Sequence, residues 1–116
     1  MKKIIILSVL AILVLSASGD PKDEASEIAQ QACIADKNSD IDTLSDLMND
    51  EMFEMNKAMH ESADPLMKNI LKMLNCDLKN TEALEGGGFV VSFKKHNSYE
   101  VKEIDGDLKV VGEQYY

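Results

Sequence analysis

The chain contains no arginine, and all twelve of its cationic residues are lysines. Twenty-one acidic residues outnumber them and give a formal net charge of −9 at pH 7. Phosphate backbones and anionic membranes attract basic surfaces, and the arginine guanidinium is the group best suited to phosphate. The composition therefore argues against a nucleic-acid partner and against an anionic membrane surface. An acidic surface of this kind mainly keeps a protein in solution.

The sequence also lacks the short motifs of common catalytic sites. It has no G-x-S-x-G elbow and no H-E-x-x-H helix, and the glycines at 86–88 lack the following lysine and helix of a phosphate-binding loop. The two histidines are His60, near a predicted helix end, and His96, in a predicted turn. Neither is expected to be a buried base. Glu51 and Glu54 are interpreted as part of a solvated helix face, and we expect no catalytic residue and no cofactor.

The longest apolar run extends from Ile4 to Leu15 and directly follows Lys2 and Lys3. It is shorter than the roughly 20 residues that a membrane-spanning helix needs. Small residues fill positions 16–19, a pattern typical of a cleaved secretory signal peptide. We expect cleavage after residue 19, with the bond after residue 18 as a close alternative. A buried N-terminal helix and an uncleaved anchor are the other interpretations.

Cleavage after residue 19 would leave residues 20–116, and these 97 residues suffice for one hydrophobic core but not for two. Loss of the two lysines would change the formal charge from −9 to −11. The junction has no cysteine, which excludes a lipid on the new N-terminus. We therefore predict a single-domain exported protein, periplasmic or secreted, without a stable membrane anchor. Its oligomeric state stays open, a homodimer included.

Cysteine is scarce, since Cys33 and Cys76 are the only two. Exported proteins meet an oxidising environment in which such a pair forms a disulfide, and two cysteines permit one connectivity. They lie too far apart in sequence for a C-x-x-C redox motif. The predicted bridge would contribute about 3–4 kcal/mol by restricting the unfolded chain. The alternatives are two buried free thiols and a metal site.

The first half of the domain has the 3.6-residue period of amphipathic helices. Asp20 or Asp23 can cap a first helix, a second starts near Asp40 and runs, long or bent, to about Glu61, and Asp64 caps a third. The apolar stripes of the three helices are Ala25, Ile28, Ala29, Ala32 and Cys33; Ile41, Leu44, Leu47 and Met48, continued by Met52, Met55 and Met59; and Leu66, Met67, Ile70, Leu71 and Leu74.

After residue 75 the period changes to two, as in strands with one buried face. Asp105-Gly106 is a strong signal for a two-residue hairpin. The residues assigned to the four strands are Cys76, Leu78 and Thr81; Phe89, Val91 and Phe93, which form one buried face; Tyr99, Val101 and Glu103; and Leu108, Val110 and Val111. Helices followed by an antiparallel meander predict an α+β fold, with about three N-terminal helices packed on a three- to four-stranded antiparallel sheet.

Methionine is frequent in the second helix, where four methionines follow i, i+4, i+7, i+11 spacing beside His60. Methionine is an adaptable filler of cores, and this stripe continues the core positions before it. The alternatives are a surface for an apolar ligand or partner and a copper site, because thioethers are soft ligands suited to Cu(I). The candidate metal ligands are Met52, Met55, Met59 and His60.

One polar stretch resembles the opening of a calcium-binding loop. Its oxygen-bearing residues are Asp36, Asn38, Asp40 and Asp42. Ile41 stands where such a loop needs glycine, and Leu47 stands where it needs a bidentate glutamate. Both departures favour a polar loop between two helices that supplies a helix cap.

Two segments of the second half resemble the nuclear transport factor 2-like superfamily, in particular its small exported, lumazine-binding-like bacterial domains. They read SFKK at 92–95 and YEVKEIDGDLKVV at 99–111, with the Asp-Gly turn and the Leu-Lys-Val ending of that family's last two strands. The position of Leu108 is often tryptophan there. The resemblance implies a cone-shaped α+β fold that often dimerises through its sheet. Enzymes of the superfamily place an Asp–His pair inside the cone, and the sequence identifies none.

The leading functional prediction is a non-enzymatic binding or accessory protein. It would hold a small apolar ligand, or an apolar segment of a partner protein, between the sheet and the helices. The predicted lining residues are Met48, Met52, Met55, Phe89, Val91 and Phe93. The alternatives are a periplasmic Cu(I)-handling protein and a small cone-fold hydrolase or isomerase that uses a pocket carboxylate.

Overall fold

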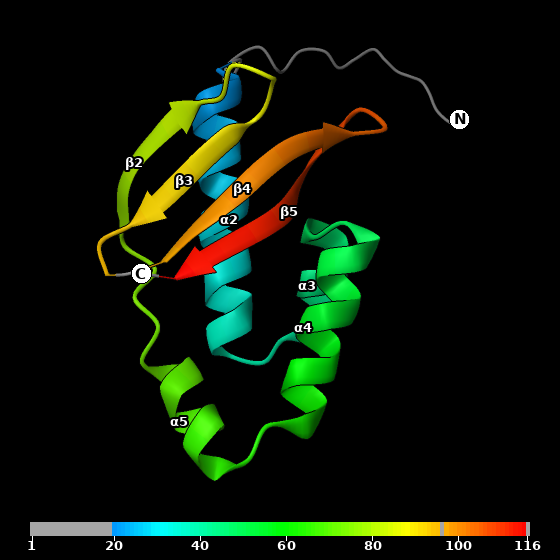
Figure 1. Ribbon diagram of the computed structural model, residues 1–116, viewed down its shortest axis with the longest axis vertical. Helices are drawn as coiled ribbons and strands as arrows, with labels where there is room; N and C mark the ends of the chain where they lie inside the picture. The colour runs from blue at the N-terminus through cyan, green and yellow to red at the C-terminus, as the bar shows by residue number, and fades with distance from the viewer. Residues whose placement is uncertain (1–19, 96, 116) are drawn as a thin grey trace.

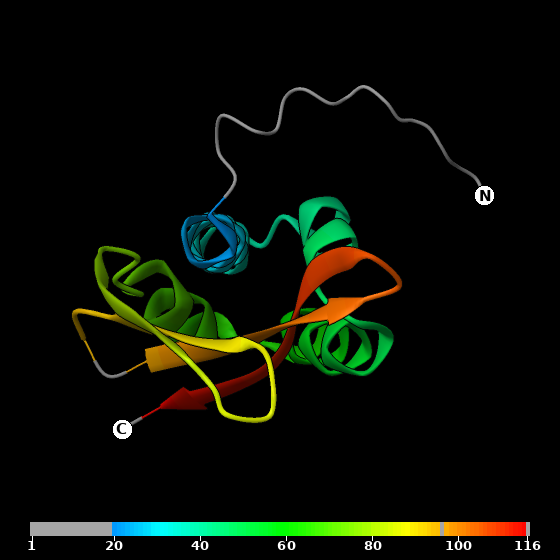
Figure 2. The ribbon, with the colours of Figure 1, turned by 90° about the horizontal axis from the view of Figure 1, so that it is seen from above.

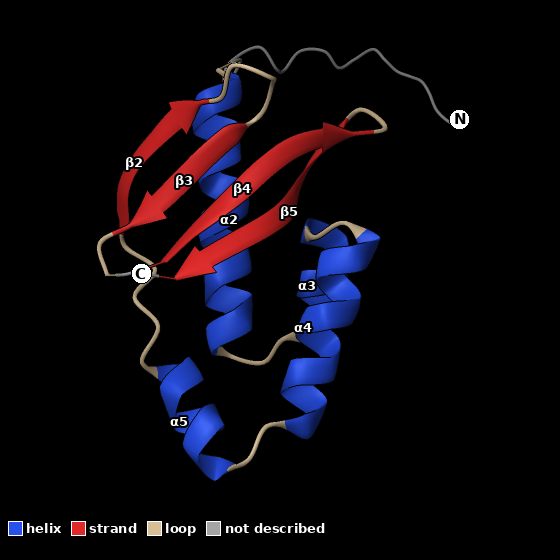
Figure 3. Ribbon diagram, in the orientation of Figure 1, coloured by secondary structure: helices blue, strands red, loops and turns tan. Residues whose placement is uncertain are grey.

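The structure, a computed structural model, describes residues 20–95 and 97–115, so the predicted signal peptide and His96 lie outside the described residues. Within these described residues four helices precede four strands, which confirms the predicted α+β class (Figures 1 and 3). The elements are α2 (Pro21–Lys37), α3 (Ile41–Leu47), α4 (Asp50–Ser62), α5 (Pro65–Lys72), β2 (Leu78–Ala83), β3 (Phe89–Phe93), β4 (Asn97–Ile104) and β5 (Asp107–Tyr115).

The strands form one antiparallel sheet in the order β2-β3-β4-β5, a simple meander. The β4–β5 hairpin closes between Ile104 and Asp107. Its two central residues, Asp105 and Gly106, have positive φ angles of 53° and 92°. Positive φ at both central positions is the geometry of the tight hairpin turn whose twist matches that of the strands, so the Asp-Gly signal is confirmed.

The predicted second helix is divided into α3 and α4, because the chain is extended at Met48. The break is made by a contact with the sheet, since Met48 forms a parallel bridge with Val110 and the N–H of Asn49 donates to the Val110 carbonyl at 2.9 Å. The side chain of Asn49 then caps α4 by accepting a hydrogen bond from the N–H of Met52. A contact between residues far apart in the chain therefore interrupts the helix that the continuous apolar pattern predicts.

The core lies between α2 and one face of the sheet (Figure 2). Alanines at 25, 29 and 32 allow the helix to approach closely, and all three are fully buried. Opposite them, the rings of Phe93 and Tyr99 meet edge to face with centroids 5.6 Å apart, a favourable arrangement for aromatic pairs. Leu44 and Met52 close the end of this core beside α3 and α4.

The prediction that the apolar stripe of the third helix is buried is wrong for most of the residues in that stripe. In α5 only Leu71 is buried, whereas Leu66 is 68% and Ile70 50% exposed and Met67 is also exposed. The helix lies away from the sheet (Figure 1), and much of its apolar surface is open to solvent. Its sequence is amphipathic, but the fold supplies only part of the surface that the stripe could cover.

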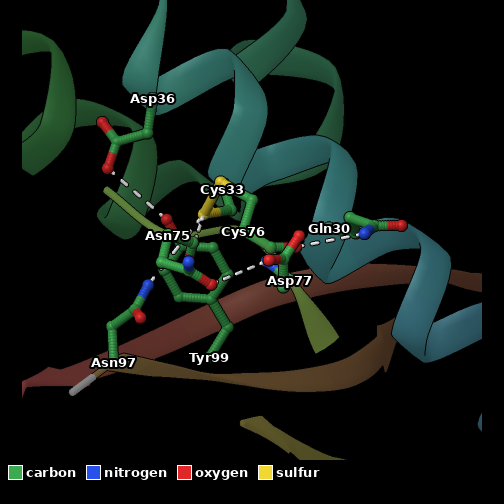
Figure 4. Close-up of a disulfide and its surroundings, with 8 residues drawn as sticks. All are labelled: Gln30, Cys33, Asp36, Asn75, Cys76, Asp77, Asn97 and Tyr99. Carbon is green, nitrogen blue, oxygen red and sulfur yellow. Dashed lines mark hydrogen bonds between the residues drawn. A yellow bond between two sulfur atoms is a disulfide. The ribbon is translucent and has the colours of Figure 1, made fainter. Parts of the chain in front are cut away.

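The predicted disulfide between Cys33 and Cys76 is confirmed. It joins the buried face of α2 to the segment before β2, and the side chain of Gln30 donates to the Cys76 carbonyl at 3.0 Å (Figure 4). Among the described residues, no helix is long and apolar enough to cross a membrane.

Candidate functional site

A buried carboxylate–imidazole pair connects the last turn of α2 to the end of α4. Nε2 of His60 lies 2.5 Å from Oδ1 of Asp36. The Asp36 side chain is fully buried, and that of His60 is 4% exposed. The second carboxylate oxygen of Asp36 accepts a longer hydrogen bond, 3.4 Å, from the hydroxyl of Tyr99 on β4 (Figure 4). Three elements therefore meet at one carboxylate.

Burial raises the pKa of Asp36, because removal from water disfavours the charged form of a carboxyl. The hydrogen bond and the charge of His60, and the hydrogen bond from Tyr99, oppose this effect by favouring the carboxylate. The shift persists because the loss of hydration is the largest of these contributions. Perturbed carboxyls of this kind gather at functional sites, although purely structural networks also produce them.

Ser39 presents its hydroxyl to the other ring nitrogen of His60, with Oγ 3.1 Å from Nδ1. It follows α2 in the left-handed conformation, at φ 56°. Its N–H donates to the Asp36 carbonyl, and the next N–H, of Asp40, donates to the Ala35 carbonyl at 2.8 Å. This pair of bonds is the Schellman motif that ends many helices, in which the left-handed residue is usually glycine. Here a serine occupies it.

The expectation that His60 is not a buried base is therefore wrong, and an Asp–His pair is present. The sequence does place both residues on the buried faces of their helices. Asp36 falls three residues after Cys33 on the buried face of α2, and His60 falls four residues after Asn56 on the buried face of α4. Each face could be inferred from periodicity, but the crossing of the two helices could not.

A second feature is an apolar groove of about 410 Å³ between α4 and α5. We call it the α4–α5 groove. Its lining residues are Met55, Asn56, Met59, Met67, Ile70, Leu71, Leu74 and Glu113. Met55 is 61% exposed, so apolar surface is open to solvent at its rim.

Asn56 is the buried polar side chain of this groove. Its amide nitrogen donates to the Met52 carbonyl at 2.9 Å. Its Oδ1 is buried without a hydrogen-bond partner in the described structure. A buried acceptor that lacks a donor costs roughly 1–3 kcal/mol, so a ligand donor that reached it would recover stability.

The structure separates the six residues predicted to line a ligand site. Met48, Met52, Val91 and Phe93 are buried in the core, and Phe89 is partly buried against it. Of the six, only Met55 lines the α4–α5 groove.

The four candidate copper ligands are separated as well. Met52 is in the core, whereas Met55 and Met59 line the α4–α5 groove. Both ring nitrogens of His60 already contact other side chains. Within residues 20–95 and 97–115, no group of three or more histidine, cysteine, aspartate or glutamate residues could hold a metal ion.

The residues that resemble a calcium loop have separate partners. Asp36 is buried against His60, while Asp40 caps α3 by accepting from the N–H and hydroxyl of Thr43 at 3.2 Å and 2.7 Å. The interpretation of this stretch as a loop that caps a helix is confirmed.

No protein-family model matches the sequence, and neither the search of curated proteins nor that of solved structures finds a significant match. The resemblance to the nuclear transport factor 2-like superfamily therefore stays a prediction.

Proposed function

We propose that this protein is an exported binding protein that holds a small apolar molecule carrying a hydrogen-bond donor in the α4–α5 groove. The observation that carries the proposal is an apolar groove, open to solvent and lined in part by Asn56, whose amide oxygen is buried without a hydrogen-bond partner among the described residues. Export is supported by the N-terminal sequence pattern and by the Cys33–Cys76 disulfide, because disulfides form and persist mainly outside the cytoplasm.

The groove has the properties of small-molecule sites. Its volume of about 410 Å³ lies in the range of roughly 300–1,000 Å³ in which such pockets fall. Most of its lining is aliphatic or thioether, which favours an apolar body in the ligand. Among the lining residues, Asn56 and Glu113 are the polar ones, and the amide oxygen of Asn56 is the acceptor that the proposal assigns to a ligand donor.

Methionines suit such a site because their flexible side chains adapt to ligands of different shape. Met55, Met59 and Met67 come from both walls of the groove. The exposed apolar surface of α5 is also explained, since a bound ligand would cover Ile70 and Met67 at the position where the fold leaves them open.

N-phenyl-1-naphthylamine is a suitable probe, because it has an apolar phenyl group, an apolar naphthyl group and one N–H, and it fluoresces when removed from water. We expect saturable binding to the mature protein. Ile70→Ser should weaken it, whereas Met73→Ser is the matched control, since Met73 is 80% exposed on the same α5 segment but does not line the groove. An absence of saturable binding, or an equal loss in both variants, would contradict the proposal.

The donor requirement has its own test. 1-Benzylnaphthalene replaces the N–H of the probe with a methylene, and its affinity can be measured by competition. Loss of one hydrogen bond of about 1 kcal/mol should weaken binding roughly fivefold. Asn56→Leu, which removes the acceptor but keeps the volume, should abolish this difference between the two compounds. If the two compounds bind wild-type protein equally, the donor is not recognised.

A further inference from the structure

The Ser39–His60–Asp36 cluster joins a hydroxyl, an imidazole and a carboxylate in a row. Ser39 Oγ lies 3.1 Å from Nδ1 of His60, and Nε2 of His60 lies 2.5 Å from Oδ1 of Asp36. With the ring proton on Nε2, facing the carboxylate, Nδ1 has a lone pair directed at the hydroxyl. This is the order of contacts by which a base activates a serine and a third group orients the base.

Solvent exposure decreases from Ser39 through His60 to Asp36. A nucleophile must be accessible to its substrate, whereas the base and the group that positions it can be buried. Ser39 is exposed and can meet a molecule from solvent, whereas His60 is almost fully buried and Asp36 fully buried. The serine also occupies a left-handed position, φ 56°, where glycine is usual and a side chain is strained. A residue held in such a conformation beside an imidazole is a candidate for function rather than for stability.

We propose that Ser39 is a nucleophile toward neutral acyl esters, with His60 as its general base and Asp36 as a positioning residue. Ser39 Oγ bonds to the ester carbonyl carbon while its proton passes to Nδ1 of His60. The bond from that carbon to the alkoxide oxygen then breaks, and His60 returns the proton to the leaving alcohol. Water attacks the acyl-serine by the same proton route, which releases the acid and restores Ser39.

The surrounding charge selects the substrate. Asp40 and Asp42, both exposed, follow Ser39 within three residues, and the chain carries a net charge of −9. These carboxylates disfavour anionic esters and also oppose the negative charge of a tetrahedral intermediate. We therefore expect slow turnover, and covalent labelling is a sharper measurement than hydrolysis. The chemistry is separate from the α4–α5 groove, so either proposal can fail alone.

A neutral fluorophosphonate tests the proposal, since it bonds to an activated serine oxygen with loss of fluoride. The rate of modification at Ser39 is compared by peptide mass spectrometry with that at Ser45 in the same molecules. Ser45 is also exposed, on α3, but its hydroxyl donates to the Asp42 carbonyl. General-base assistance should make Ser39 react about a hundredfold faster.

Three controls follow from the geometry. Ser39→Ala should remove the rapid phase, and urea should remove the selectivity of the wild-type protein. His60→Gln and Asp36→Asn should each slow Ser39 but not Ser45 in variants that remain folded, because unfolding alone would also remove the selectivity. Equal rates at Ser39 and Ser45 in the folded protein, or selectivity that survives in urea, would overturn the proposal. This comparison within the wild-type protein holds even if a variant fails to fold.

Discussion

The imidazole of His60 and the carboxylate of Asp36 lie 2.5 Å apart, although 24 residues separate them in the chain. The contact joins the end of α4 to the last turn of α2 in a place that water hardly reaches. Removal of one partner of a buried pair leaves the other without compensation, which makes such pairs sensitive points of a fold. Asp36 is therefore important for both stability and the proposed reactivity of Ser39.

The pH dependence of stability should contain a contribution from Asp36. Burial raises the pKa of this carboxyl above its ordinary value of 3.8, so the folded protein binds the proton more tightly than the unfolded chain does. This contribution is fully present below the unfolded pKa and is lost as the pH rises through the folded pKa. Relative to Asp36→Asn, the wild-type free energy of unfolding should therefore fall as the pH rises from the ordinary pKa of the carboxyl, 3.8, through its raised pKa in the folded protein.

Urea unfolding of both proteins at several pH values checks this prediction. Asparagine keeps the shape of the side chain and an acceptor for His60, so the difference between the two proteins reports the ionisation of Asp36 together with its electrostatic interaction with His60. The other acidic residues contribute equally to both and cancel. A difference that stays constant, or rises with pH, would contradict the assignment.

The left-handed conformation of Ser39 predicts a difference between two substitutions. Both Ser39→Gly and Ser39→Ala remove the hydroxyl that faces His60, but only glycine accepts φ 56° without steric cost. The glycine variant should be more stable than the alanine variant by about 1 kcal/mol. Chemical denaturation of the two variants under the same conditions measures this difference. Equal stabilities would mean that the position is not strained.

Gly88 and Gly86 should differ sharply in their tolerance of a methyl group. At Gly88, φ is +88° and a Cβ would lie 2.8 Å from the Val101 carbonyl oxygen and 2.6 Å from Cγ of Lys102. The lysine side chain can move, but the backbone oxygen cannot. At Gly86 an added Cβ meets nothing within 4 Å.

Gly88→Ala should therefore destabilise the protein by about 2 kcal/mol, whereas Gly86→Ala should change its stability by less than about 0.5 kcal/mol. Thermal unfolding followed by circular dichroism compares the two variants with the wild type. If both are tolerated, the turn before β3 has a different conformation from the one described.

Local patterns were sufficient to predict much of this fold. The alanine stripe of α2, the alternation of Phe89, Val91 and Phe93, and the Asp105-Gly106 turn each depend on interactions between near neighbours in the chain. The disulfide required only two cysteines in a chain that the N-terminal pattern predicts to be exported. In each case the physical cause is contained in the sequence segment itself.

The features that escaped prediction depend on contacts between distant segments. The break between α3 and α4 is made by Val110, which lies more than sixty residues after Asn49. The pairing of Asp36 with His60 requires two helix ends to meet. Ile70 is exposed because no other described element fully covers this side of α5. The periodicity of α5 predicts an apolar face, but it does not predict whether another element covers that face.

The bond between Cys33 and Cys76 closes a covalent ring, and α3, α4 and α5 lie entirely within it. Among the lining residues of the α4–α5 groove, only Glu113 is outside the ring. The sheet, by contrast, is held by its own hydrogen bonds beyond residue 76. Reduction of the disulfide would therefore open this covalent ring, whereas it would break no hydrogen bond of the sheet. The groove is therefore built almost entirely from one covalently closed segment of the chain.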